Sequence, residues 1–258
     1  MSGDVAERWN RLIASPRSVY ATREVPAREV RALAASGYAR WITEHAPPGA
    51  RILEAGCGGG KFSLALAWLG HRVTALDASR GVLDNLERNR DRLAGELGKT
   101  LAVETLEGDV EAMPFADGTF DVAASEGVLE HWMTRGERVR VLAEMARVTR
   151  PGGRVVVFVP NGRHPFYRWW RWTGYPGYAS MDAVPWFRYD FRMLAQEAGE
   201  AGLVEVEADG LSPWGTLAVW PDWRVLRLAA AVLARVLPEP RRLRRWMGFN
   251  LVARGRRP

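Results

Sequence analysis

Cysteine is nearly absent from this sequence of 258 residues, which contains only Cys57. A single thiol cannot form an intramolecular disulfide, and no cluster of cysteine and histidine has the spacing of a zinc site, so no metal is expected. The N-terminal segment also lacks the apolar stretch of a signal peptide. These absences indicate a reducing, cytoplasmic location.

Long apolar runs are missing as well. The longest, residues 225–237, contains two arginines and covers 13 residues, whereas a helix that spans a membrane needs about 20 apolar residues. With 47% hydrophobic and 26% charged residues, the composition is that of a folded globular protein. The sequence therefore predicts one large domain or two small ones, with no membrane crossing.

Lysine is scarce, and the net charge of +6 is unevenly distributed. Residues 220–258 contain ten arginines against two acidic residues, which leaves the rest of the chain with a charge of −2. A slightly acidic main body argues against a groove that follows the phosphates of a nucleic acid. The basic character belongs to the C-terminal part.

Apolar periodicity predicts strands that alternate with helices after residue 50. We expect strands at 51–55, 71–76, 101–106, 120–125, 154–160, 203–208 and 249–253, and helices at 61–69, 80–97, 138–148 and 189–202. Two or three further helices are expected within residues 5–45. Such alternation is typical of a parallel sheet covered on both faces, and the last two strands could form an antiparallel edge.

A glycine-rich turn follows the first strand. Gly56, Gly58 and Gly60 permit a tight turn and let a ligand approach backbone N–H groups. Their spacing differs from the G-x-G-x-x-G of dinucleotide-binding proteins, and Glu54 before them would repel a pyrophosphate but suits an ammonium group. The loop favours a nucleoside that carries an amino acid, although a purely structural turn remains open at this point.

Several motifs in order resemble the class I S-adenosylmethionine-dependent methyltransferases, in particular the small-molecule group that includes the ubiquinone and menaquinone methyltransferases. The resemblance is strong over residues 50–158. Its motifs are residues 53–60, Asp77 at the end of the second strand, Gly108-Asp109-Val110, the stretch from Ser125 to His131, and Arg150-Pro151-Gly152-Gly153 as a turn before the fifth strand. The cofactor implied by this resemblance is S-adenosyl-L-methionine.

The resemblance also assigns roles to single residues. Glu54 would orient the amino end of the cofactor, Asp77 would accept both ribose hydroxyls, and Asp109 would accept the adenine amino group. A carboxylate suits the ribose because it can accept two O–H bonds at once. The predicted cofactor-binding residues are Glu54, Gly56, Cys57, Gly58, Gly60, Asp77, Ala78, Asp109, Val110, Ser125 and Glu126.

The fold expected from these patterns is α/β, Rossmann-like and doubly wound, with a mostly parallel seven-stranded sheet. Residues 1–46 would form an N-terminal helical cap and residues 47–210 the cofactor-binding core. Residues 211–258 would add a basic amphipathic insertion, which could act as a lid, and the last strand of the same domain.

His131 is the candidate general base, because it follows the fourth strand at its carboxyl end. An imidazole with a pKa of about 6.5 can remove a proton from a hydroxyl or amine at neutral pH. The alternative, which carries equal weight, is a structural histidine that shapes the cofactor pocket, and His164 is a weaker candidate. A base is not essential, since the sulfonium is already a good leaving group and alignment provides most of the acceleration.

Aromatic residues are dense between the fifth strand and the next helix, where arginines are interleaved with them. We expect a lid over an apolar or planar substrate, with an aromatic subcore as the alternative. The predicted lid residues are Tyr167, Trp170, Tyr175, Tyr178 and Trp186.

Residues 224–246 predict an apolar helix with a basic stripe, followed by an arginine cluster. Such a segment can contact an anionic membrane surface, and the alternative, which we prefer slightly, is a lid or dimer helix whose arginines face solvent. A nucleic-acid substrate is not expected, because the position after the fourth strand lacks the motif of amino-group nucleic-acid methyltransferases and Cys57 lies in the glycine loop.

Taken together, the motifs predict an S-adenosylmethionine-dependent methyltransferase that acts on a small apolar or aromatic metabolite. Two alternatives remain open from the sequence. The first is a catalytically silent scaffold that binds the same cofactor. The second is a nicotinamide-dependent oxidoreductase, which the glycine spacing disfavours. The metabolite, the acceptor atom and the oligomeric state do not follow from the sequence.

Overall fold

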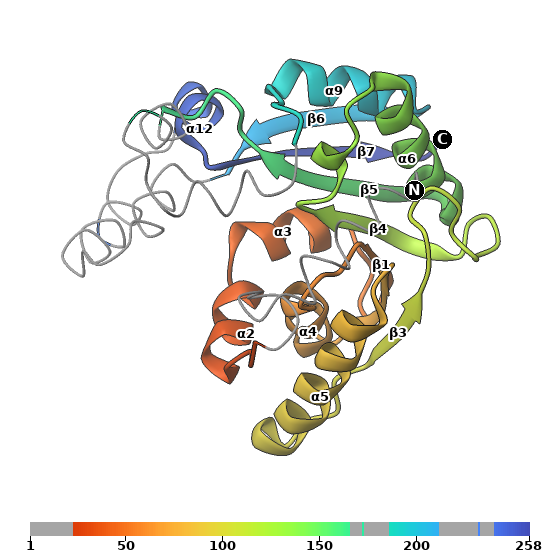
Figure 1. Cartoon of the computed structure of the whole chain (residues 1–258), viewed down its shortest axis with the longest axis vertical. Helices are drawn as coiled ribbons and strands as arrows, with labels where there is room; N and C mark the ends of the chain where they lie inside the picture. Colours follow the sequence, from red (N-terminus) through yellow and green to blue (C-terminus); the bar gives the residue numbers. More distant parts are fainter. Residues whose placement is uncertain (1–22, 166–171, 173–185, 212–231, 233–239) are drawn as a thin grey trace.

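A seven-stranded sheet forms the centre of the computed structural model, which describes residues 23–165, 172, 186–211, 232 and 240–258. Its strands are β1 (Arg51–Ala55), β2 (Arg72–Asp77), β3 (Val103–Glu107), β4 (Phe120–Glu126), β5 (Thr149–Pro160), β6 (Val204–Gly210) and β7 (Asn250–Arg256). They lie in the order β3-β2-β1-β4-β5-β7-β6 (Figure 1). β1 to β5 pair in parallel. The predicted α/β fold with a mostly parallel sheet is therefore confirmed.

The last two strands pair in antiparallel fashion, as expected. β7 lies inside the sheet and pairs with both β5 and β6, so that β6 is the edge strand. The edge is irregular, because the pairing shifts between Val204 and Glu207 and the intervening Glu205 has a positive φ of 52°. An irregular, charged edge strand resists pairing with other chains.

Helices cover both faces of the sheet. α2 (Ala27–Ala34), α3 (Gly37–Thr43), α4 (Lys61–Trp68) and α5 (Arg80–Leu97) lie on one side, and α6 (Arg135–Val148) and α9 (Phe191–Glu200) on the other (Figure 1). Successive strand residues point to opposite faces, and the neighbours Ile52 and Leu53 accordingly belong to two different apolar cores. The sheet is thus doubly wound, as predicted.

Several element boundaries differ from the prediction by one to five residues, and two of them have a clear local cause. α6 begins at Arg135 instead of residue 138, because Thr134 accepts from the backbone of Glu137, whose side chain in turn accepts from the Thr134 backbone. This capping box stabilises the first turn. The expected turn at residues 150–153 lies inside β5, as an irregularity where the pairing with β4 shifts.

Parts of three predicted regions lie outside the described residues. They include Tyr167, Trp170, Tyr175 and Tyr178 of the predicted lid, most of the expected basic helix at 224–246, and residues 1–22 of the predicted helical cap. The domain boundaries at 46 and 210 therefore stay predictions. Among the described residues, no helix combines the length and the apolar character needed to cross a bilayer.

Candidate functional site

The glycine loop between β1 and α4 has a backbone that favours glycine. Gly56, Gly58 and Gly60 have φ values of 72°, 48° and 69°, in the left-handed region. At Gly56 a Cβ would lie 2.5 Å from a methyl group of Val128. The loop can therefore pass close to the segment after β4 only without a side chain at this position. Cys57 packs as a small buried residue, and burial raises the pKa of its thiol.

Asp77 ends β2 beside this loop. One carboxylate oxygen accepts from the backbone N–H of Gly58 at 2.9 Å and the other from that of Ser79 at 3.0 Å. Burial raises the pKa of Asp77, and these backbone donors oppose the increase. A carboxylate has about four acceptor sites, so Asp77 can still accept hydroxyl groups of a ligand. Ala78, the next predicted residue, is half-buried.

Asp109 and Val110 follow β3 at the same end of the sheet. Asp109 accepts from the backbone N–H of Glu111 at 2.9 Å, and Gly108 donates to the carbonyl oxygen of Asp77 at 3.0 Å. Val110 is buried in the core. The ends of β2 and β3 are thus joined, and the two predicted nucleoside-binding carboxylates follow neighbouring strands.

Glu54 lies in β1 and is buried, with 4% of its surface exposed. Its carboxylate accepts from the hydroxyl of Ser63, a partner in α4 that the sequence analysis did not identify. Burial raises the pKa of Glu54 to about 8, and the charge of Glu126 adds to this increase. Both carboxyl groups line a cavity of about 10 Å³, which is room for roughly one water molecule. The other lining residues are Ile42, Phe62, Leu66, Ala124, Ser125 and Phe158.

Further acidic residues lie at the end of β4 and directly after it. Ser125 is buried, and Glu126 accepts from the side-chain amide of Asn250 at 3.2 Å. Glu130 lies in the 3-10 helix η1 (Leu129–His131), where burial raises its pKa to about 8 with a contribution from Glu126. Its Oε2 atom has no hydrogen-bond partner among the residues that the structure describes. The sequence analysis did not single out Glu130, and its burial was not anticipated.

The two candidate histidines have different surroundings. His131 is the last residue of η1 and half-buried, so it lies just beyond the carboxyl end of β4. His164 is buried, its Nε2 atom lies 2.9 Å from the carbonyl oxygen of Met247, and burial lowers its pKa to about 4. A ring nitrogen that faces a carbonyl oxygen must donate, which gives His164 a structural role. His131 remains the candidate base.

A buried ion pair, which the sequence analysis did not identify, supports η1. Arg138 of α6 and Glu197 of α9 approach to 2.6 Å, and each side chain is 3% exposed. Arg138 also donates to the carbonyl oxygens of Trp132 and Met133, at 3.1 and 2.8 Å. One guanidinium group therefore joins both helices to the residues that directly follow His131.

The same pair holds the segment that follows the predicted lid. Tyr189 donates to Glu197 at 2.6 Å, and the Arg138 guanidinium lies 3.6 Å from the ring centre of Phe187. Phe187 donates its backbone N–H to the carbonyl oxygen of Glu130 at 2.6 Å. Trp186, the described member of the predicted lid residues, is half-buried and lies beneath Arg188. The end of this segment is thus fixed against η1.

The chain is similar in sequence to known methyltransferases. Residues 53–157 match a family model described as a methyltransferase domain. The cypemycin N-terminal methyltransferase of Streptomyces sp is 40% identical over 121 residues, which is 46% of this chain and 45% of the relative. A probable tRNA methyltransferase 9B of Homo sapiens is 30% identical over 168 residues, which is 63% of this chain and 31% of the relative. The chain thus spans half or less of the length of these curated relatives.

Among solved structures, the magnesium protoporphyrin IX methyltransferase from Synechocystis PCC 6803 with bound SAH has a TM-score of 0.58. The match covers 98% of this chain and 94% of that structure at 14% identity. At this identity the likeness concerns the fold, and it extends over nearly the whole chain.

Proposed function

Because residues 53–157 match a family model described as a methyltransferase domain, we propose that this protein is a class I S-adenosylmethionine-dependent methyltransferase, which transfers a methyl group from S-adenosylmethionine to a small apolar or aromatic molecule. The observation that carries the proposal is the arrangement around Asp77. Its carboxylate is fixed by the glycine loop on one side and by Ser79 on the other. It retains acceptor capacity at the carboxyl end of the sheet, where ligands of such folds bind.

The chain's own residues bind and orient in this proposal. Asp77 accepts the ribose hydroxyls, Asp109 accepts the adenine amino group, and the glycine loop leaves room for the methionine part. The cofactor supplies a methyl group on a sulfonium, which is activated before it is bound. His131 takes the proton of the methyl acceptor where that atom loses one.

Calorimetric titration with S-adenosylmethionine and S-adenosylhomocysteine tests the proposal, with a nicotinamide dinucleotide as the control. We expect binding of both sulfur nucleosides with dissociation constants of about 1 to 100 μM, and no response to the dinucleotide. Binding without turnover on any acceptor would favour the silent-scaffold alternative. Binding of the dinucleotide alone would contradict the proposal and favour an oxidoreductase.

The acceptor is proposed to be a small molecule and not a nucleic acid. The names of the relatives point to different acceptors, an N-terminus in one and tRNA in another, so they do not select one class of acceptor. The acidic balance of the main body disfavours a phosphate-binding groove. Transfer of labelled methyl groups to quinones, phenols, amines and lipids, beside total tRNA, distinguishes these classes. Labelling of tRNA alone would overturn this part of the proposal.

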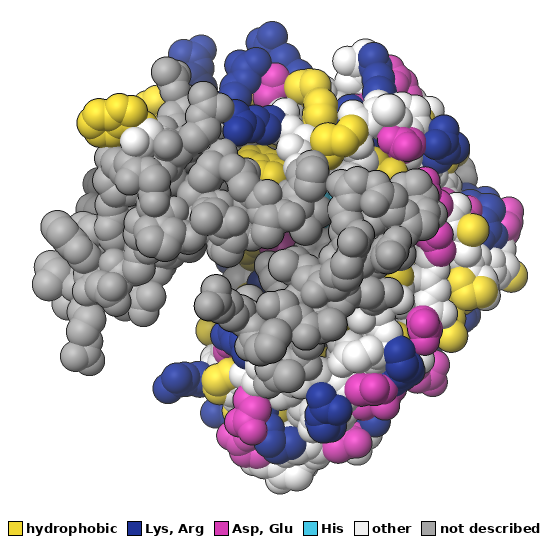
Figure 2. All heavy atoms as spheres, in the orientation of Figure 1, with side chains coloured by type: hydrophobic (Ala, Val, Ile, Leu, Met, Phe, Trp, Pro, Cys, Tyr) yellow, Lys and Arg dark blue, Asp and Glu magenta, His cyan; other side chains and the backbone are white. Residues whose placement is uncertain are grey.

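We also propose that the basic C-terminal region contacts an anionic membrane surface from the cytoplasm. In the short helix α12 (Arg241–Met247), Arg244 and Arg245 lie within 4 Å of Asp209, whereas Arg241 and Arg242 are exposed. Trp246 is 57% exposed. Figure 2 shows Lys and Arg side chains gathered over α12 and α9. Exposed arginines beside a tryptophan suit the interface of an anionic bilayer.

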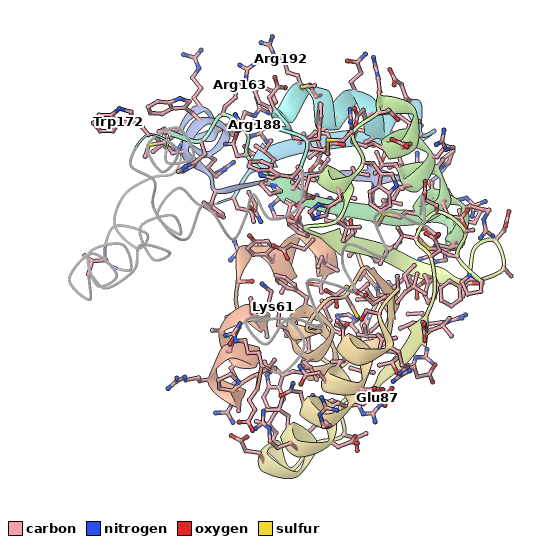
Figure 3. The ribbon with its side chains drawn as sticks, in the orientation of Figure 1. Lys61, Glu87, Arg163, Trp172, Arg188 and Arg192 are labelled. Carbon is pink, nitrogen blue, oxygen red and sulfur yellow. The ribbon has the colours of Figure 1, made fainter. Side chains whose placement is uncertain are left out.

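Further labelled side chains lie on the same side of the molecule. Figure 3 places Arg163, Arg188 and Arg192 toward the top of the view, together with Trp172. Trp172 is 84% exposed. This side therefore combines several positive charges with a second exposed tryptophan.

Co-sedimentation with phosphatidylglycerol vesicles tests the membrane contact. We expect binding that weakens with salt and is lost in the double variant Arg241→Glu/Arg242→Glu. The matched control is Arg28→Glu/Arg88→Glu, which makes the same charge change on exposed positions of α2 and α5. Equal loss in both variants, or binding to neutral phosphatidylcholine vesicles, would contradict a specific basic face.

A further inference from the structure

Three polar side chains from distant parts of the chain meet at the carboxyl ends of β4 and β5. Asn250, the first residue of β7, donates its side-chain N–H groups to the hydroxyl oxygen of Tyr38 at 2.8 Å and to Glu126 at 3.2 Å. We call Tyr38, Glu126 and Asn250 the acceptor corner. Tyr38 comes from α3, Glu126 from β4 and Asn250 from β7.

The orientation of the Asn250 amide follows from its partners. An ionised carboxylate only accepts, so the amide nitrogen and not the oxygen must face Glu126. Within the described part of the chain the amide oxygen has no hydrogen-bond partner, although Asn250 is only 5% exposed. A buried acceptor without a donor is unfavourable and rare in folded proteins. It therefore marks a place where a donor can bind.

Glu126 supplies a negative charge at this corner, near two carboxyl groups, Glu54 and Glu130, whose pKa of about 8 keeps them protonated at neutral pH. Glu126 contributes to the raised pKa values of both Glu54 and Glu130, so its carboxylate lies near both buried groups. Lys61 is the cation that contributes to the pKa of Glu54, but it is the smallest contribution and lowers that pKa only weakly. The described residues give Lys61 no ion pair with these carboxyl groups. The corner thus offers acceptors and negative charge without a matching internal cation.

Aromatic rings form the apolar wall beside it. Tyr38 packs against Phe62 and Phe158, with ring centres 5.1 and 4.9 Å apart. Phe62 and Phe158 also line the cavity that Glu54 and Glu126 share. The ammonium group of Lys61, labelled in Figure 3 at the start of α4, lies 4.9 Å from the ring centre of Phe62. Aromatic faces next to carboxylates are the surroundings that proteins use for organic cations.

Asn250 lies beyond the strands that carry Asp77, Asp109 and the glycine loop. Glu126 of β4, in contrast, is also a predicted cofactor-binding residue and shares a cavity with Glu54 of β1. In the sheet order, Asp109 follows β3, Asp77 ends β2 and the glycine loop follows β1, whereas the corner is built on β4 and β7. Neighbouring strands are about 4.8 Å apart, so Asn250 lies three strand positions, or about 14 Å, from the strand of the glycine loop. The corner therefore extends from the strand beside the glycine loop, at Glu126, to Asn250 on the side that we assign to the methyl acceptor.

We propose that the methyl acceptor carries an amino group, which binds in the acceptor corner between Glu126 and the free oxygen of Asn250. The apolar body of the same molecule lies against the half-buried ring of Tyr38, which Phe62 and Phe158 support from the core. This inference rests on the proposed methyltransferase function and adds the chemical class of the substrate. In this proposal an N–H group of the substrate is recognised by Glu126 and Asn250, which do not belong to one sequence motif.

A pair of small probes that differ in one group tests this. The wild-type protein is titrated calorimetrically with benzylamine and with benzyl alcohol, both with and without saturating S-adenosylhomocysteine. We expect the amine to bind at least about tenfold more tightly than the alcohol, because its ammonium gains a charged and a neutral acceptor. Equal binding of the two probes, or no binding of either, would overturn the proposal.

Two variants then locate the preference. Glu126→Gln should remove most of the tenfold advantage of the amine, whereas Glu107→Gln, at the carboxyl end of β3 and exposed, should keep it. An amine preference that survives Glu126→Gln would show that the amine binds elsewhere. Circular dichroism confirms that both variants are folded, and the wild-type comparison holds independently of either.

The cofactor's own ammonium group is the competing occupant. Methylthioadenosine lacks the amino-acid part of S-adenosylhomocysteine, so comparing the two ligands isolates this contribution. If Glu126→Gln weakens S-adenosylhomocysteine but not methylthioadenosine, while the wild type shows no amine preference, the corner serves the cofactor and the proposal is overturned. If S-adenosylhomocysteine does not bind at all, the proposed methyltransferase function is contradicted instead. The titrations of benzylamine and benzyl alcohol without S-adenosylhomocysteine test the amine preference independently of that outcome.

Discussion

The two ends of the binding edge are built in different ways. At the β1–β3 end, Asp77 and Asp109 accept from backbone N–H groups of nearby loops, those of Gly58, Ser79 and Glu111. At the β4–β7 end, the polar groups depend on side chains from remote segments or have no partner. The first end is organised by local backbone geometry before a ligand binds. The second is organised by tertiary packing and keeps unsatisfied acceptors.

The Arg138–Glu197 pair gives the largest expected contrast between the two ends. Glu197→Gln leaves the buried guanidinium without its counter-charge, so we expect a loss of about 3 to 5 kcal/mol in the free energy of unfolding, measured with urea. Glu200→Gln is the matched control, since Glu200 pairs with Arg135 across the same two helices but is exposed. The control should cost less than about 1 kcal/mol. Similar losses in both variants would show that the buried pair does not support the β4–β7 end.

Asp77→Ala tests the locally organised end. We expect the affinity for S-adenosylhomocysteine to fall by about 1 to 3 kcal/mol in calorimetry, because the ribose hydroxyls lose a charged acceptor. Asp84→Ala, an exposed partner of Arg80 in α5, is the control and should leave the affinity unchanged. Unchanged affinity in the Asp77 variant would remove Asp77 from the binding site.

A pH series on Glu130→Gln tests the buried carboxyl group at the β4–β7 end. The pKa of Glu130 is about 8 in the folded protein against an ordinary value of 4.5. Between these values the folded state holds a proton that the unfolded state has lost, so stability falls as pH rises. The variant lacks this group. Its free energy of unfolding relative to that of the wild type should therefore rise by about 1 kcal/mol between pH 6 and pH 7, measured by urea unfolding. Glu104→Gln, exposed in β3, serves as control, and parallel pH profiles for Glu130→Gln and wild type would contradict the burial argument.

The sequence predicted the parts of the fold whose signals are local. Strand and helix order, the glycine loop and the position of Asp77 follow from patterns within a few residues, and the structure has the strands and helices within a few residues of the predicted bounds. The capping box of α6 is also a local signal, but the predicted start of this helix at residue 138 rested on the apolar pattern alone. Its Thr134 and Glu137 stand three positions apart, which is the recognised spacing.

The remaining contacts had no local signal. Tyr38 and Asn250 are 212 residues apart, and Arg138 and Glu197 are 59 apart. The pairing of β7 between β5 and β6 decides which of the many charged and polar residues come into contact. The periodicity of the sequence does not indicate this pairing. The burial of Glu130 likewise depends on the backbone contact of Phe187, which comes from beyond the predicted lid.

The position of β7 between β5 and β6 also sets an order of events during synthesis. A ribosome releases β1 to β5 before the later strands, and these five pair with one another in parallel. β6 finds its neighbour only when residues 250–256 emerge, and Asn250 arrives with them. A growing chain therefore completes the end of the sheet that carries Asp77 and Asp109 well before it completes the proposed acceptor corner.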